Sequence, residues 1–119
     1  MKARIIKEFR FEAAHWLPNV APAHHCSHIH GHSYRVEIAL KGDVGQAGWL
    51  VDFADIAKAW EPISAKLDHA VINEVVNNPT SEMLARWIWD ELLGALPMLD
   101  RVTVWETADA RCEYEGDYG

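Results

Sequence analysis

Cysteine, basic residues and long apolar runs are all scarce in this chain of 119 residues. Its two cysteines, Cys26 and Cys112, are too few for a disulfide scaffold, and we expect free thiols in a reducing compartment. Eleven Lys and Arg against eighteen Asp and Glu give a net charge of −7, which excludes the basic surface that nucleic acid requires. No apolar run approaches the roughly 18 residues of a membrane span, and the N-terminus is unlike a signal peptide. We therefore expect a soluble, cytoplasmic protein without nucleic-acid or membrane partners.

Alternating hydrophobicity predicts two strands in the first third of the chain. Over residues 3–15 the apolar side chains and His15 share one parity, and charged side chains occupy the other. The same alternation returns over residues 30–41, with His30 and His32 in line with the apolar face. Histidines therefore stand at the end of one strand and at the start of the next.

Two helices are expected after these strands. The first covers residues 53–67 at helical spacing, and Pro62 should kink or briefly interrupt it. The second begins at a capping Thr80 or Ser81, and its apolar stripe extends to Leu96.

Two further strands, over residues 101–107 and 112–115, complete the order ββααββ. This order predicts a single α+β domain over residues 1–119, with an antiparallel sheet and both helices on one face. The other face of the sheet then needs a cover. Six tryptophans in so short a chain also favour a shared surface, so we expect a homo-oligomer.

The densest chemical signal is a histidine cluster, in which five of seven histidines fall within nine positions: His24, His25, His28, His30 and His32. Residues i and i+2 of a strand lie roughly 6.5 Å apart on one face, so His30 and His32 can tilt toward one ion. His15 could supply a third nitrogen if the two strands pair. Three histidines with an open fourth position are typical of a catalytic zinc site. A lone histidine on a strand is usually a core residue, and spacing alone also allows His28 as a ligand.

Four other side chains are candidates for chemistry. Cys26 lies four residues before His30 and is either a fourth ligand or a nucleophile or base beside the metal. Asp68 and His69 follow the first helix, where His69 is either a cation at the helix dipole or an acid/base set by the carboxylate. Glu106 shares a face with apolar residues and needs a donor, and a guanidine-like edge, such as the N–H pair of a pterin, would satisfy it in bidentate fashion.

Six motifs then give a resemblance over nearly the whole chain: FEAAH (11–15), C-x3-HGHSY (26–34), GWLVDFADI (48–56), LDHAVIN (67–73), NPTSE (78–82) and VWET (104–107). In this order they resemble the 6-pyruvoyltetrahydropterin synthase superfamily. Within it the sequence is most similar to the bacterial branch, the 6-carboxy-5,6,7,8-tetrahydropterin synthases of queuosine biosynthesis. The short C-x3-HGH spacing is typical of this branch.

The resemblance implies the tunnelling fold (T-fold), in which trimers close a barrel and two trimers stack into a hexamer with active sites at subunit interfaces. It implies Zn2+ at His15, His30 and His32, catalysis by Cys26 and by His69 with Asp68, and a pterin anchored by Glu106. The implied reaction converts 7,8-dihydroneopterin triphosphate and water to 6-carboxytetrahydropterin, acetaldehyde and triphosphate. Pyruvoyl-forming synthase activity and a noncatalytic pterin- or metal-binding module are the alternatives. The acidic charge suits a triphosphate poorly, so neighbouring subunits must supply Lys and Arg, or the substrate is less phosphorylated.

Overall fold

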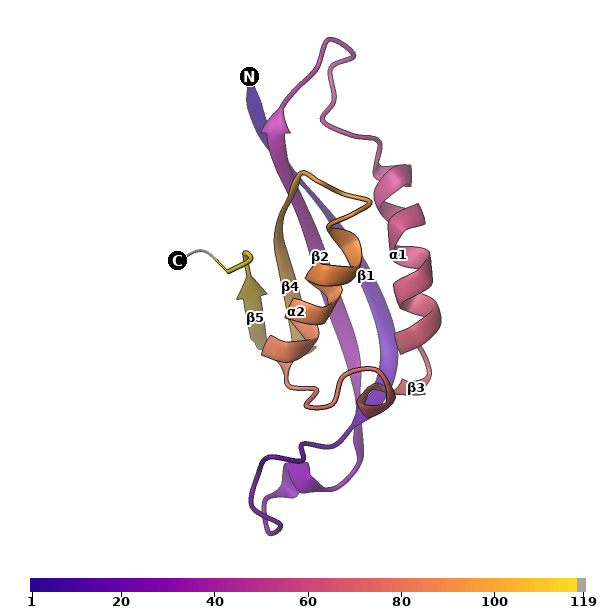
Figure 1. The fold of residues 1–119 in the computed structure, drawn as a ribbon, viewed down its shortest axis with the longest axis vertical. Coiled ribbons are helices and arrows are strands. Elements are labelled where there is room, and N and C mark those ends of the chain that lie inside the picture. Colours follow the sequence, from indigo (N-terminus) through magenta and orange to yellow (C-terminus); the bar gives the residue numbers. More distant parts are fainter. Residues whose placement is uncertain (118–119) are drawn as a thin grey trace.

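A five-stranded sheet in the order β3-β1-β2-β4-β5 forms the frame of the protein (Figure 1). The computed structural model describes residues 1–117, and Tyr118 and Gly119 of the predicted domain lie outside the described residues. The strands are β1 (Lys2–His15), β2 (His30–Asp43), β3 (Ala70–Val71), β4 (Leu99–Thr107) and β5 (Ala110–Tyr114).

The strands β1 and β2 make the longest pairing in the sheet, antiparallel from Lys2 opposite Asp43 to His15 opposite His30. Their alternation buries one face, and there the rings of Phe11 and Tyr34 stack with centroids 4.9 Å apart. The predicted alternation is therefore correct over both strands, and it fixes which side chains point inward.

Both helices cover the same face of the sheet, α1 (Phe53–Leu67) beside β1 and α2 (Ser81–Leu92) in front of β4 (Figure 1). Asp52 Oδ1 accepts from Ala54 N–H at the start of α1, and Thr80 Oγ1 accepts from Met83 N–H at the start of α2. Each isoleucine or leucine fully buried between helices and sheet contributes about 1.5–3 kcal/mol. Neither helix in the described residues is long and apolar enough to cross a membrane.

The α+β class, with two helices on one face of the sheet, is confirmed, but several details differ from the prediction. The helix α1 runs through Pro62 without interruption, because Pro62 is exposed and water can hydrogen-bond the backbone group that it leaves free. The helix α2 ends at Leu92, two residues before Gly94, and Leu96 reaches the core from a turn. The short strand β3 was not predicted, and it pairs with β1 in parallel.

The helix-free face of the sheet is charged rather than apolar. Glu8 forms ion pairs with Arg10 at 3.2 Å and with Arg35 at 3.3 Å. The Arg35 guanidinium also lies 4.1 Å from the ring centroid of Trp105, a cation–π contact. Because this face is charged, burial of apolar surface does not require a second subunit to cover it. The oligomeric barrel therefore stays a prediction.

Candidate functional site

Three histidines meet where β1 ends and β2 begins. His15 lies directly opposite His30 in the antiparallel ladder, and His32 is the next inward residue of β2. Their ring centroids are 4.6 to 5.1 Å apart, and one potential ligand atom from each ring lies within 4.8 Å of the others. His15 is 1% exposed, so water does not solvate its ring.

Backbone carbonyl groups fix two of these rings. His15 Nδ1 lies 2.8 Å from the carbonyl oxygen of Pro79, and His30 Nδ1 lies 2.7 Å from that of His28. A carbonyl oxygen only accepts, so each Nδ1 must carry a proton and donate it. In the neutral rings the lone pair is therefore on Nε2, which is the arrangement found in histidines that bind metals.

The free nitrogens converge on one position. Nε2 of His15 and Nε2 of His30 lie 3.0 Å apart, and among the described residues the buried Nε2 of His32 has no hydrogen-bond partner. Two lone pairs that face each other at this distance repel unless a cation lies between them. Two nitrogens bound about 2.0 Å from a tetrahedral ion are about 3.3 Å apart. The three histidines therefore fit a divalent metal ion.

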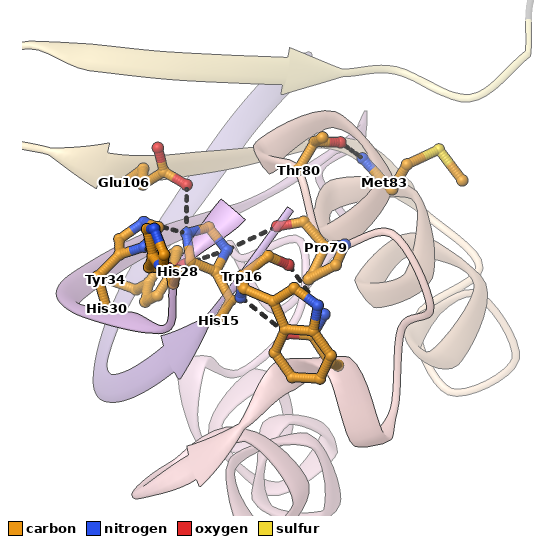
Figure 2. Close-up of polar contacts among 10 residues, drawn as sticks. His15, Trp16, His28, His30, Tyr34, Pro79, Thr80, Met83 and Glu106 are labelled. Atoms are coloured by element: carbon orange, nitrogen blue, oxygen red, sulfur yellow. Dashed lines mark hydrogen bonds and ion pairs between the residues drawn. The ribbon is translucent and has the colours of Figure 1, made fainter. Parts of the chain in front are cut away.

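A carboxylate and a hydroxyl border the histidines. Figure 2 shows the His15 ring between the Pro79 carbonyl and Glu106, whose Oε1 lies 3.5 Å from His15 Nε2. Burial lowers the pKa of His32, which Glu106 raises and the two neighbouring imidazoles lower again, so His32 favours its neutral form. The Tyr34 hydroxyl lies 3.2 Å from His15 Nδ1, and burial raises the pKa of this phenol.

Cys26 lies apart from this group, in a short 3-10 helix, η1 (His25–Ser27), within the loop between β1 and β2. Among the described residues its potential metal-binding partners are His24 and His25, and its thiol does not join the group of His15 and its neighbours. Cys26 is partly buried and free, so the thiol is available for chemistry.

Asp68 and His69 form a pair just beyond α1. Asp68 Oδ1 lies 3.0 Å from His69 Nδ1 and also accepts from Glu12 N–H at 3.0 Å. The hydrogen bond from Glu12 is the main reason that the pKa of Asp68 lies below its usual range, and His69 lowers it further. His69 is 80% exposed on its side chain and has φ 59°, a left-handed conformation that costs a non-glycine residue energy.

Two cavities bring these candidates to one end of the sheet, and both are lined by Gly31, His32 and Ser33. The first, of about 500 Å³, also contacts His69. The second, of about 420 Å³, also contacts Glu106. A ligand in either cavity would lie beside His32, with the proposed acid/base on one side or the proposed anchor on the other.

Three supporting groups were not predicted from the sequence. The same alternation that selected His30 and His32 could have found Tyr34, which is the next inward residue of β2. The carbonyl groups of Pro79 and His28 could not have been found, because every residue has one and only the fold aims it.

Comparisons with known proteins concern the family and the fold of the chain. Residues 4–117 match the family model described as 6-pyruvoyl tetrahydropterin synthase. A Synechocystis protein named 6-carboxy-5,6,7,8-tetrahydropterin synthase is 37% identical, over 92% of this chain and 91% of its own. A Pyrococcus furiosus protein named dihydroneopterin monophosphate aldolase is 32% identical, over 97% of this chain and 99% of its own. The solved Caenorhabditis elegans 6-pyruvoyl tetrahydropterin synthase superposes with TM-score 0.90 at 24% identity, covering 98% and 97% of the two chains. This superposition confirms the T-fold of the single chain.

Proposed function

The chain belongs to the 6-pyruvoyl tetrahydropterin synthase family, and we propose that it is a zinc-dependent 6-carboxy-5,6,7,8-tetrahydropterin synthase acting in the cytoplasm, in queuosine biosynthesis. It converts 7,8-dihydroneopterin triphosphate and water to 6-carboxytetrahydropterin, acetaldehyde and triphosphate. The observation that carries the proposal is the convergence of Nε2 of His15 and Nε2 of His30 beside Nε2 of His32, which has no hydrogen-bond partner among the described residues. Relatives named for this activity, at 26–37% identity, support it further.

His15, His30 and His32 would hold the zinc ion. Zinc supplies Lewis-acid chemistry, which lowers the pKa of hydroxyl groups on the substrate side chain. The protein keeps the His15 and His30 rings in place through Nδ1 hydrogen bonds, so the orientation of these two rings requires no rearrangement when the metal binds.

Four other side chains would bind the substrate and move protons. The Glu106 carboxylate would accept two N–H groups from the guanidine-like edge of the pterin. Cys26, as thiolate, and His69 would transfer protons between carbon and oxygen atoms of the substrate side chain. Asp68 would orient His69 through the 3.0 Å contact to Nδ1, which leaves Nε2 free to face the cavity.

We also propose a homo-oligomer in which trimers close a barrel, two trimers form a hexamer and active sites lie at subunit interfaces. The exposed position of His69 and the openness of both cavities on the single chain are compatible with completion by a neighbour. Sedimentation equilibrium should give about six times the 13.5 kDa chain mass, and a monomer would contradict the assembly.

A second candidate is cleavage of a less phosphorylated substrate, as the name of the Pyrococcus furiosus relative suggests for that protein. Arg10 and Arg35 line the cavity that contacts Glu106, but both pair with Glu8. Little free positive charge therefore remains there for a triphosphate.

The test is anaerobic incubation of zinc-loaded protein with dihydroneopterin triphosphate and, separately, with the monophosphate. Acetaldehyde and 6-carboxytetrahydropterin from the triphosphate support the first candidate. A pyruvoyl pterin without acetaldehyde indicates the pyruvoyl-forming reaction. Release of glycolaldehyde phosphate from the monophosphate supports aldol cleavage instead.

Two variants separate an enzyme from a binding module. Cys26→Ala should lower turnover by about 10²–10⁴-fold while His15, His30 and His32 keep their zinc, whereas Cys112→Ala, at the other free cysteine, should not lower it. His30→Ala should lose the metal. Unchanged product formation in Cys26→Ala, or no product from either substrate, would overturn the proposed enzyme.

A further inference from the structure

A second group of metal-binding side chains lies outside the histidine site, in the loop between β1 and β2. His24, His25 and Cys26 each offer a ligand atom, and these atoms lie within 4.8 Å of one another. The loop extends past the end of the sheet, away from α1 and α2 (Figure 1). His24 and His25 are exposed and Cys26 is partly buried, so an ion can reach them from solvent in the single chain.

Hydrogen bonds fold this loop without help from a metal. Cys26 O accepts from Leu17 N–H at 2.8 Å, and His24 N–H donates to Ala21 O at 2.8 Å. The Ser27 hydroxyl donates to Pro22 O at 2.9 Å. The three donors are therefore held near one another in advance, which lowers the entropy cost of binding an ion.

The geometry points to a second metal site, and we propose that His24, His25 and Cys26 bind a divalent zinc ion. One thiolate and two imidazoles are ligands that zinc prefers, and water would complete four-coordination. The rings of His24 and His25 stack with centroids 4.7 Å apart and planes inclined by 19°. Binding displaces the thiol proton of Cys26 to solvent, so the ion meets a thiolate.

The tautomer of His24 also favours this assignment. His24 Nδ1 accepts from Cys26 N–H at 3.0 Å, so the lone pair of this nitrogen already points toward residue 26. An ion that takes this lone pair displaces an amide hydrogen bond in an exposed loop. Water can replace that bond, so the exchange is easily reversible.

Occupancy of this site would switch the protein off at high zinc. The ion would bind the thiolate of Cys26 and remove it from proton transfer, while the metal at His15, His30 and His32 stays in place. This consequence rests on the proposed catalytic role of Cys26, whereas the metal site itself does not.

Cobalt titration of the metal-free protein tests the site without an activity assay. Co²⁺ bound to a thiolate gives an intense charge-transfer band in the near ultraviolet, which cobalt bound to histidines alone lacks. The parent protein should bind two equivalents, and the band should grow only with the second. His25→Ala should bind one equivalent without the band. The control His28→Ala, an exposed histidine of the same loop, should behave like the parent.

Three outcomes would overturn the site: no thiolate band in the parent protein, a band that grows with the first equivalent, or an undiminished band in His25→Ala. Retention of the first equivalent in His25→Ala shows that the variant is folded.

A second arm measures, for each variant, the ratio of turnover with excess zinc to turnover with one equivalent. In the parent this ratio should be about 0.01 or less, as expected for loss of a general acid/base. In His25→Ala it should stay near one. A thiolate band without inhibition upholds the site and overturns the switch. Absence of turnover at one equivalent overturns the proposed enzyme and leaves the cobalt result standing.

Discussion

The contact between Nε2 of His15 and Nε2 of His30, at 3.0 Å, makes a quantitative prediction about metal and stability. Because both Nδ1 atoms donate to carbonyl groups, these two lone pairs are available to a cation in the folded chain. The unfolded chain holds no such arrangement. Zinc should therefore bind the folded state selectively, and removing zinc with a chelator should lower the melting temperature.

The size of this effect follows from linkage. Free zinc at about a hundred times its dissociation constant stabilises a one-site protein by about 2.7 kcal/mol. The entropy of unfolding is about 2.1 cal/mol/K per residue, or about 250 cal/mol/K for 119 residues. Dividing the stabilisation free energy by this entropy of unfolding predicts a rise in melting temperature of about 11 °C.

The assay is calorimetry in zinc buffers, after competition with a chelator has given the dissociation constant. The background His25→Ala removes the second proposed site, so that only His15, His30 and His32 bind the ion. His30→Ala added to this background should lose most of the 11 °C, and His28→Ala should keep it. The reasoning fails if zinc leaves the melting temperature of the background unchanged, or if His30→Ala retains the full rise.

Three further predictions concern residues around the site. Tyr34→Phe removes the hydroxyl 3.2 Å from His15 Nδ1 and should cost about 0.5–1.5 kcal/mol in urea denaturation. It should also lower the affinity for zinc, measured by chelator competition, by only about tenfold, because a backbone carbonyl still holds that nitrogen. An unchanged affinity would contradict the supporting role. The pKa of Asp68 is lowered in the folded state, so its contribution is present above the ordinary carboxyl pKa and is lost as pH falls through the folded value. Asp68→Asn, which keeps an acceptor for Glu12 N–H, should therefore lose less stability between pH 5 and about pH 2 than the parent in pH-dependent urea titrations, and equal losses would refute this. His69→Gly removes the strain of a non-glycine residue at φ 59°. The free energy of unfolding should therefore rise or fall by no more than about 1 kcal/mol relative to the parent. Turnover should nevertheless fall about 10²–10⁴-fold, and full activity in this variant would exclude His69 as acid/base.

The strands and helices that alternation and helical spacing predicted are the ones with a single buried face. Phe11 and Tyr34 lie on the buried face while their neighbours in the strand are charged or polar, and this contrast is visible in the sequence. The strand β3 has two residues and no period to recognise. It forms because Asp68 accepts from Glu12 N–H and His69 N–H donates to Glu12 O, which places the chain beside β1. Such long-range contacts have no local signature.

The candidate site, like the fold, was predictable only where side chains follow a strand alternation. Parity identified His30 and His32, and strand pairing was the condition for adding His15, a condition that the register now meets. Spacing could not decide whether His28 or Cys26 joins them. The fold separates these residues because each lies before β2 begins, where side chains no longer follow the strand alternation. The side chain of His28 stays outside the ligand group, and its backbone carbonyl instead accepts from His30.

The register of β1 against β2 makes the core and the histidine site one structural unit. Because side chains alternate with period two, a slip of one residue would turn every inward side chain of β2, including His30 and His32, to the charged face. The stacked Phe11 and Tyr34 oppose such a slip, and so does the pairing of Ile5 with Leu40 at the far end. The loop that holds Cys26 has no part in this register. Changes in its length would therefore move the thiol while the three imidazoles stay together.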